Sequence, residues 1–335
     1  MLIIIKISVV IPTRDRPKDL LELLFALLKQ HAPPFEVIIV DDSSSRSVKR
    51  IINFFASKFR TIGTTVKYIR GSGEGLPSAR NIGVNEAEGD AILFLDDDTI
   101  LDRNVISIVS DFLDKHPEAL GLQVNIVGSK DKRKLPFAIV GNLLNKIFML
   151  GYCEPNKLQV RRSGAYIFPK PLTKIITAQR LSGCCCCYRR RVFNEFKFDE
   201  KLKGWANMED IDFSYRIYKK YPHSLYAIPD ATIIHKGSQQ SKLPEKIRIY
   251  MSIIYWFYVF FKDVFDGSIL NLLAFLWALL GNLAATIGGL IIKRKTKIEW
   301  WNLIYLLEAY LIAFKNLKDI LQLKLDFFNQ RMVGR

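Results

Sequence analysis

The chain alternates between short apolar runs and longer stretches in which apolar residues recur every three or four positions. The runs predict buried strands and the periodic stretches predict helices. The predicted strands are residues 1–11, 36–40, 66–69, 91–95 and 119–127, and the predicted helices are residues 19–30, 46–59, 77–88 and 103–115. This alternation is typical of a mostly parallel sheet with helices on both faces. The expected fold class is therefore α/β.

The pattern is then interrupted and later resumes. Residues 129–179 are irregular, and no element is assigned to them. An apolar run follows at residues 181–188, a helical stretch at 209–220, and short strands near 225–228 and 232–235. We therefore expect one large domain, residues 1–242, made of a first half (1–128) and a second half (129–242).

After residue 242 the composition changes. Residues 269–292 contain no charged side chain, and a stretch of that length is a candidate membrane span. The aromatic-rich residues 247–265 precede it and the basic cluster 293–297 follows it. Because basic clusters favour the cytoplasmic side, we expect a membrane hairpin over residues 247–292, with the cluster on the same side as the first domain. The alternative is packed or interfacial helices that never cross.

Residues 300–328 predict an amphipathic helix, so residues 243–335 form a helical, membrane-associated region. The 335 residues carry a net charge of +16, which implies an anionic partner: phosphate, nucleic acid or an anionic membrane face. Hydrophobic residues make up 49% of the chain, which excludes wholesale disorder. Five cysteines, four of them contiguous, cannot form a disulfide framework, which indicates a reducing compartment.

Acidic residues follow two of the predicted strands. Asp41 and Asp42 end one, and Asp96, Asp97 and Asp98 end another. The ligand site of such a sheet lies at the carboxyl ends of its strands. Strand geometry places Asp96 and Asp98 on one face and Asp97 on the other. A divalent cation would relieve the repulsion between the paired carboxylates and bind a diphosphate. The alternative is a solvated acidic turn that caps a helix.

A glycine-rich segment, Gly71–Gly75, lies before a predicted helix that contains Arg80. The glycines permit close approach of a ligand to the backbone. Arg80 can pair either with a phosphate or with the acidic cluster. This is not a Walker loop, because no Gly-Lys-Ser/Thr follows.

Several short motifs, taken together, resemble the family 2 glycosyltransferases of GT-A fold, and among them the membrane-associated, rhamnosyltransferase-like enzymes that build polysaccharides and lipid-linked glycans. The motifs are Ser8–Thr13, Val40–Ser43, Ala79–Gly83, Phe94–Asp98, Leu181–Gly183, Tyr188–Arg190, Phe198–Glu200, Gly204–Trp205, Glu209–Phe213, Arg216, Ile228–Ala231 and His235. They occur in order over residues 7–236. The resemblance implies a nucleotide-diphosphate-sugar donor and a mixed sheet flanked by helices.

The resemblance also implies residue roles. Pro12, Thr13 and Asp42 would border the nucleotide, with Arg14, Arg80 and Asp97 as further donor-site residues. Asp96 and Asp98 match the family's Asp-x-Asp element, which holds Mg²⁺ or Mn²⁺, and His235 matches a histidine that completes the metal site in some relatives. His235 could equally be a hydrogen-bonded residue at a strand end.

Asp210 matches the catalytic base, which would give inversion at the anomeric carbon by single displacement. Glu209 is the neighbouring candidate if the register differs by one, and a plain helix-terminal carboxylate is the alternative. Trp205 and Gly183 are expected at the sugar and acceptor site, although Trp205 could instead be a core aromatic residue. Cys184–Cys187 cannot surround one zinc ion on a strand and are expected to be packing residues.

The prediction is thus a membrane-attached, metal-dependent hexosyltransferase at the cytoplasmic face of the cell membrane, acting on a lipid-linked or cell-surface glycan. The second half of the first domain would bind this acceptor. Two alternatives are an inactive nucleotide-sugar-binding protein of the same fold and a basic nucleic-acid-binding protein. Recognisable nucleic-acid-binding motifs are missing from the sequence, so we expect no nucleic-acid partner.

Overall fold

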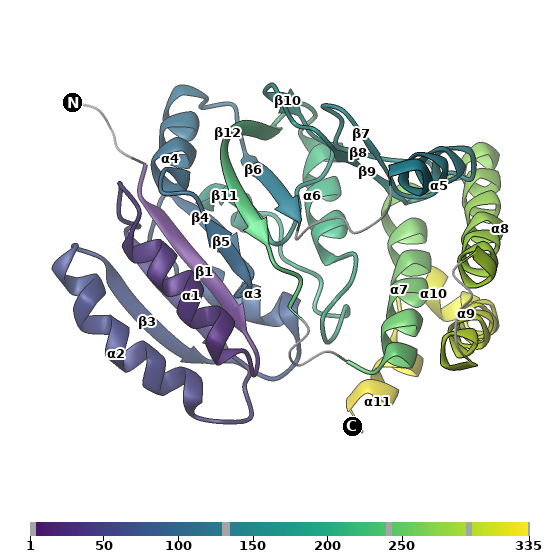
Figure 1. Cartoon of the computed structure of the whole chain (residues 1–335), viewed down its shortest axis with the longest axis horizontal. Coiled ribbons are helices and arrows are strands. Elements are labelled where there is room, and N and C mark those ends of the chain that lie inside the picture. Colours follow the sequence, from purple (N-terminus) through teal and green to yellow (C-terminus); the bar gives the residue numbers. More distant parts are fainter. Residues whose placement is uncertain (1–4, 129–134, 239–242, 293–296, 334–335) are drawn as a thin grey trace.

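The computed structural model describes residues 5–128, 135–238, 243–292 and 297–333. Parts of three predicted features, namely residues 1–4 of the first strand, the domain boundary at residue 242 and residues 293–296 of the basic cluster, lie outside the described residues. A mixed nine-stranded sheet forms the centre of the first domain, with most strands in the order β10-β12-β6-β11-β4-β1-β2-β3, while β5 pairs with β12 (Figure 1).

The strands of this sheet are β1 (Ile7–Thr13), β2 (Glu36–Asp41), β3 (Thr65–Arg70), β4 (Ala91–Leu95), β5 (Thr99–Leu101), β6 (Gly121–Gly128), β10 (Ile176–Thr177), β11 (Cys185–Arg189) and β12 (Leu225–His235). β1 lies between β2 and β4 and is parallel to both. β11 is antiparallel to β4 and β6, so the sheet is less parallel than the alternation of elements suggested. The two short strands expected at the end of the domain are one strand, β12, whose register shifts between Ile228 and Thr232.

Helices cover both faces because the strands are buried on both sides. One apolar core joins the sheet to α1 (Pro17–Leu28), α2 (Ser47–Thr61) and α4 (Val105–Lys115). A second core, on the other face, contains residues of α3 (Leu76–Glu86) and α6 (Glu209–Lys220). These helices match the predicted positions to within a few residues. The carboxyl ends of β1, β2 and β4 are left open between the helices.

The segment that the sequence left unassigned contains α5 (Leu135–Ile147) and a small separate sheet. Its strands are β7 (Tyr152–Glu154), β8 (Gln159–Val160) and β9 (Tyr166–Pro169), in the order β7-β9-β8. These strands are two to four residues long. Such short strands show no readable alternation of polar and apolar residues.

The C-terminal region packs on the first domain through α7 (Glu245–Val259) and a π-helical turn at Phe260–Val264. Residues 253–260 of this segment are all buried in a third apolar core. The expected first leg of a membrane hairpin is therefore a helix buried by protein, and the hairpin prediction is corrected. Within the described part of the chain, only residues 269–291 form a helix long and apolar enough to span a bilayer.

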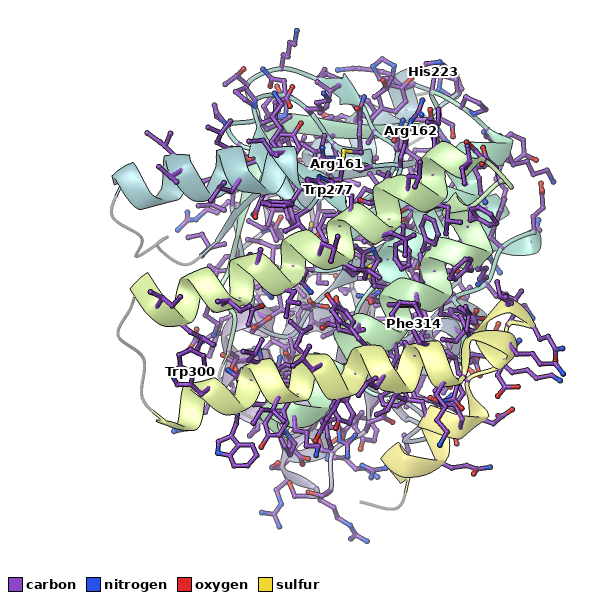
Figure 2. The ribbon with its side chains drawn as sticks, turned by 90° about the vertical axis from the view of Figure 1, so that its right-hand side faces the viewer. Arg161, Arg162, His223, Trp277, Trp300 and Phe314 are labelled. Atoms are coloured by element: carbon purple, nitrogen blue, oxygen red, sulfur yellow. The ribbon has the colours of Figure 1, made fainter. Side chains whose placement is uncertain are left out.

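That helix is α8 (Ile269–Ile292), and it lies beside α9 (Lys297–Lys315) and α5 on one side of the molecule (Figure 2). Short helices α10 (Leu317–Leu321) and α11 (Asp326–Val333) complete the described chain. The single amphipathic helix predicted over residues 300–328 is thus broken after Lys315 and again after Leu321.

Candidate active site

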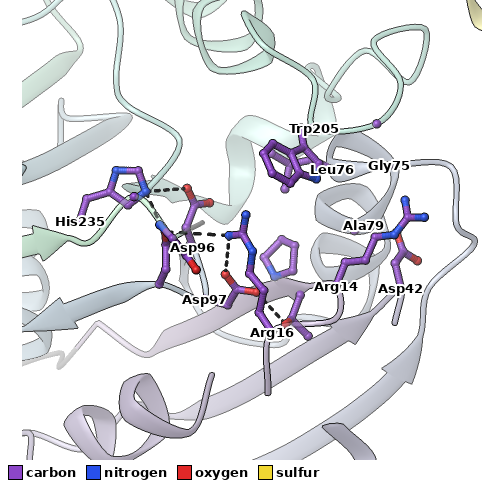
Figure 3. Close-up of a pocket in the computed structure, with 16 residues that line it drawn as sticks. Arg14, Arg16, Asp42, Gly75, Leu76, Ala79, Asp96, Asp97, Trp205 and His235 are labelled. Atoms are coloured by element: carbon purple, nitrogen blue, oxygen red, sulfur yellow. Dashed lines mark hydrogen bonds and ion pairs between the residues drawn. The ribbon is translucent and has the colours of Figure 1, made fainter. Parts of the chain in front are cut away.

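A cavity of about 290 Å³ opens at the carboxyl ends of β1, β2 and β4 (Figure 3). The predicted residues that line it are Pro12, Thr13, Arg14, Asp42, Asp96, Asp97, Asp98, Trp205 and His235. They come from five separate segments of the chain. We call this space the first cavity.

The three aspartates leave the sheet because β4 ends at Leu95. The turn is closed by Thr99, whose amide and hydroxyl both donate to the Asp96 carbonyl, at 3.2 and 2.8 Å. Although these residues are not on a strand, Asp96 and Asp98 still face the same side, and Asp97 points elsewhere. The turn therefore preserves the predicted arrangement, in which Asp96 and Asp98 face one side and Asp97 faces another.

Asp96, Asp98 and His235 bring ligand atoms within 4.8 Å of one another. The Nε2 atom of His235 lies 3.1 Å from Asp98 and 3.9 Å from Asp96. Burial alone would raise the pKa of Asp98, but the adjacent imidazole lowers it to about 2. The Asp98 oxygen that faces His235 is the buried Oδ1 atom, and the pair lacks the geometry of a normal hydrogen bond. An ionised carboxylate whose buried Oδ1 atom faces an imidazole, beside a second carboxylate, fits a divalent cation.

Asp97 turns away from that group toward β1. It accepts hydrogen bonds from the Thr13 hydroxyl at 2.8 Å and from Arg16 at 3.0 Å. Burial raises the pKa of Asp97 to about 7, against the effect of Arg16. The Arg16 guanidinium also lies 3.9 Å from Asp98 and stacks over the ring of Trp205, with the centroid 5.1 Å away. Arg16 was not among the predicted site residues, yet it lies at the centre of the first cavity (Figure 3).

Asp42 closes the far end of the first cavity. Its carboxylate accepts a hydrogen bond from the Gly73 amide at 2.9 Å. A side chain at Gly71 would collide with Asp42, because a Cβ atom there would lie 2.1 Å from a carboxylate oxygen. The glycine-rich segment is thus required to let the backbone pack against Asp42. Burial raises the pKa of Asp42.

A second cavity, of about 500 Å³, adjoins the first. Leu76, Asp96, Trp205 and His235 line both cavities, so the two spaces meet at these residues. The second cavity is lined by the predicted Gly183, Glu209 and Asp210, and on its other side by α7. All the predicted site residues therefore lie on one of two connected cavities.

Asp210 stands at the start of α6, on the wall of the second cavity. Its Oδ2 atom accepts hydrogen bonds from the Gly183 amide at 3.1 Å and from Arg180 at 3.3 Å. The side chain retains 19% exposure. Arg180 is almost fully buried and stacks over Tyr166, with the ring centroid 4.3 Å away. Arg180 is a second site residue that the sequence analysis did not identify.

Glu209 is held differently. It is buried, and its Oε1 atom accepts a hydrogen bond from Arg80 at 2.9 Å. Burial, and then the charge of Asp210, raise the pKa of Glu209 to about 8. Arg80 is fully buried, lies 3.5 Å from Asp96 and donates to the Gly183 carbonyl at 2.9 Å. Of its two predicted pairings, Arg80 therefore makes the one with acidic groups, and it does not line the first cavity.

The four contiguous cysteines lie beneath this site, and all are buried. Cys185 and Cys187 face one apolar core and Cys186 faces the other. Burial raises the pKa of Cys186 to about 12, and burial raises the other three pKa values further. They are packing residues, as predicted.

The fold and this site agree with what comparison with known proteins finds. Residues 8–197 match the model of the family described as glycosyl transferase family 2. The match covers more than half of the chain, and the chain belongs to this family. The fold is accordingly of the GT-A type.

Particular relatives extend this comparison. The poly(ribitol-phosphate) beta-N-acetylglucosaminyltransferase TarS of Staphylococcus aureus (strain Mu50) is 32% identical over 113 residues, which are 33% of this chain and 19% of TarS. The crystal structure of S. aureus TarS 1–349 in complex with UDP-GlcNAc has a TM-score of 0.52 at 20% identity, covering 89% of this chain and 79% of that one. The structure of GalNAc-T7 with UDP, GalNAc and Mn²⁺ has a TM-score of 0.53 at 17% identity, covering 84% and 55%. At these identities the structures show a common fold.

Proposed function

We propose that this chain is an inverting, metal-dependent hexosyltransferase that moves a sugar from a nucleotide diphosphate to an acceptor hydroxyl. The observation that carries this proposal is the junction of the two cavities at Asp96 and His235. The metal-type ligands lie on the first cavity and Asp210 lies on the second, so a donor and an acceptor could meet between them. UDP-sugars are the first donors to examine, because TarS and GalNAc-T7 were crystallised with UDP-GlcNAc and with UDP.

Asp96, Asp98 and His235 would hold Mg²⁺ or Mn²⁺. The bound cation would stabilise the negative charge that develops on the departing nucleoside diphosphate. Thr13 and Arg16 hold Asp97 away from this group. Pro12, Arg14 and Asp42 line the part of the first cavity left for the nucleotide.

Asp210 would accept the proton of the acceptor hydroxyl. It is more exposed than Glu209, and its hydrogen bonds from Gly183 and Arg180 keep it aimed at the second cavity. Glu209 is occupied by Arg80 and serves to position the start of α6. A single displacement with one base inverts the anomeric carbon.

The acceptor we propose is a glycan, lipid-linked or at the cell surface, reached from the cytoplasmic face of the membrane. The support is the second cavity's position against α7, the helix that connects the first domain to the apolar α8 and α9. Residues 129–242 would form the acceptor half of the domain and residues 243–335 its membrane-associated region.

The experiment measures UDP release from UDP-GlcNAc, UDP-GalNAc and UDP-Glc with and without Mn²⁺. We expect Asp98→Ala to abolish the metal-dependent reaction. Asp210→Asn should keep donor binding, seen as a ligand-induced rise in Tm, and lose about 10²–10⁴-fold in rate, as expected for a general base. Asp111→Asn, on the exposed side of α4, is the matched control. Normal turnover in Asp210→Asn, or Mn²⁺-dependent activity in Asp98→Ala, would contradict these assignments.

A further inference from the structure

The surface of the protein has an unusual concentration of apolar side chains on three helices. Among the residues whose side chains the structure describes, 26 large apolar side chains are exposed, and 18 of these belong to α5, α8 and α9. They are Ile139, Val140, Leu143, Leu144 and Ile147 on α5; Ile269, Leu270, Leu273, Leu276, Trp277, Leu280 and Ile291 on α8; and Trp300, Trp301, Ile304, Leu307, Leu311 and Phe314 on α9. We call these residues the apolar face. Figure 2 shows the three helices side by side across one side of the molecule.

Specific contacts make the three helices one surface. The Trp277 ring stacks on Phe148, directly after α5, with centroids 5.1 Å apart, and its Nε1 atom donates to the Ile147 carbonyl at 3.0 Å. Gly281 lets α8 approach Phe148, because a Cβ atom there would lie 2.2 Å from it. On the other side, the Tyr310 hydroxyl of α9 donates to the Leu279 carbonyl at 3.1 Å. α8 therefore lies against the protein between α5 and α9.

Two polar side chains in the middle of α8 and α9, Asn282 and Glu308, turn toward the protein, which is the reverse of a helix that faces water. Asn282 of α8 donates to the Tyr310 hydroxyl at 3.1 Å. Glu308 of α9 turns toward α7, where it accepts a hydrogen bond from Tyr250 and pairs with Lys246 at 3.0 Å. Only 28% of the most apolar stretch of α8 is buried by the protein. The sides of α8 and α9 that face away from the protein are thus suited to an apolar environment.

Basic residues flank these helices in the sequence. In the sequence, Lys130, Lys132, Arg133 and Lys134 come immediately before α5, and Lys293, Arg294, Lys295 and Lys297 join α8 to α9. The start of α5, the end of α8 and the start of α9 lie at the same edge of the three-helix surface (Figure 2). Cationic residues next to an apolar surface complement the phosphate groups of a bilayer with anionic lipids.

We infer that the apolar face binds in the plane of an anionic phospholipid bilayer, with α5, α8 and α9 lying on the membrane and none of them crossing it. If α8 crossed the bilayer, it would either lose its contacts with α5 or draw α5 into the bilayer with it. The basic residues that the sequence places next to these helix ends favour lipid over a second protein chain, whose apolar contact surface would be depleted of charge. The inference about this surface does not depend on the proposed transfer reaction. A single helix, α7, lies between the apolar face and the second cavity.

The test is flotation of the full chain with vesicles, in the absence of any donor. We expect binding to vesicles of phosphatidylcholine with phosphatidylglycerol, weaker binding to phosphatidylcholine alone, and release by salt. Leu143→Glu, Leu280→Glu and Leu311→Glu, one per helix, should each lower partitioning at least about tenfold. Phe54→Glu, equally exposed on α2, is the matched control and should bind like the wild type. Circular dichroism of each variant checks that the fold is retained.

Depth measurements separate in-plane binding from spanning. Fluorescent probes attached at Leu273 and Ile291, near opposite ends of α8, should be quenched equally by lipids brominated at one depth. Different depths at the two positions would overturn the inference, as would wild-type binding by Leu143→Glu or absence of vesicle binding. A dimer that is dissociated by Leu143→Glu, without lipid binding, would assign the face to a second copy instead. Because no donor is used, failure of the proposed reaction would not affect the result.

Discussion

Gly75 lies where the glycine-rich segment touches the loop that carries Trp205. The two backbones form a bridge between Gly75 and Gly204, and the Leu76 amide donates to the Gly204 carbonyl at 2.9 Å. Gly75 has a φ angle of +113°, a backbone conformation that glycine adopts readily and residues with a Cβ atom rarely adopt. A Cβ atom at this position would lie 2.4 Å from the Gly204 nitrogen and 2.7 Å from its oxygen. Gly75→Ala therefore adds both backbone strain and a backbone collision.

The size of the effect follows from the geometry. Ordinary contact begins at 3.4 Å, so the two loops must separate by about 1 Å. Trp205 follows Gly204 directly and lines both cavities. A displacement of about 1 Å can cost about 10²-fold in rate, which corresponds to about 2.7 kcal/mol. We expect Gly75→Ala to lower kcat/KM for sugar transfer by about this factor.

The control is Gly73→Ala in the same segment. Gly73 also has positive φ, +76°, but a Cβ atom there meets nothing within 4 Å. This variant carries backbone strain alone, about 1–2 kcal/mol, and should retain wild-type kcat/KM. Steady-state kinetics with the preferred UDP-sugar, together with thermal unfolding, measures both effects. Equal kcat/KM for the two variants would refute the reasoning that the contact between Gly75 and Gly204 positions Trp205.

Three further predictions concern buried groups. Arg80→Met should lower the free energy of unfolding by about 3–5 kcal/mol in urea titrations, because Glu209 and Asp96 lose a fully buried cation; a loss below about 1 kcal/mol would contradict this. Iodoacetamide should modify Cys153 in the folded chain and leave Cys184–Cys187 unmodified, as checked by mass spectrometry, because burial raises their pKa values. Burial and Asp212 raise the pKa of Asp263 to about 8, so the native state loses stability as the pH rises from about 4 to about 8. Asp263→Asn removes this loss, and its Tm relative to wild type should increase over that range; a constant difference would disprove the assignment.

The sequence predicted the first half of the domain well because its strands are unambiguous. β1, β2 and β4 are apolar on both faces and stop at a polar residue or a turn. The predicted hairpin failed at α7 for a physical reason. A helix that is apolar all round is buried either by lipid or by protein, and composition alone does not distinguish the two. The partners of α7, which include α9 and residues of the first domain, become visible only in the fold.

The same limit applies to the site. The aspartates and His235 were identified from motifs, because each motif is local in the sequence. Arg16 and Arg180 were missed because what defines them is a contact with a distant residue. Arg16 meets Asp97, 81 positions away, and Arg180 meets Asp210, 30 positions away. Two arginines among 49 basic residues carry no local signal that separates them from the rest.

The contact between the C-terminal region and α6 connects the proposed membrane surface to the proposed base. Lys262, in the turn after α7, pairs with Asp199 at 2.6 Å and with the fully buried Asp212. Asp212 is on the same first turn of α6 as Asp210 and also binds Arg216 at 2.7 Å. The helix that presents the base is thus fixed by charge to the segment that leads into α8. A bilayer bound to the apolar face would therefore hold Asp210 at a constant height above the lipid, and an acceptor anchored in that bilayer would enter the second cavity from the side of α7.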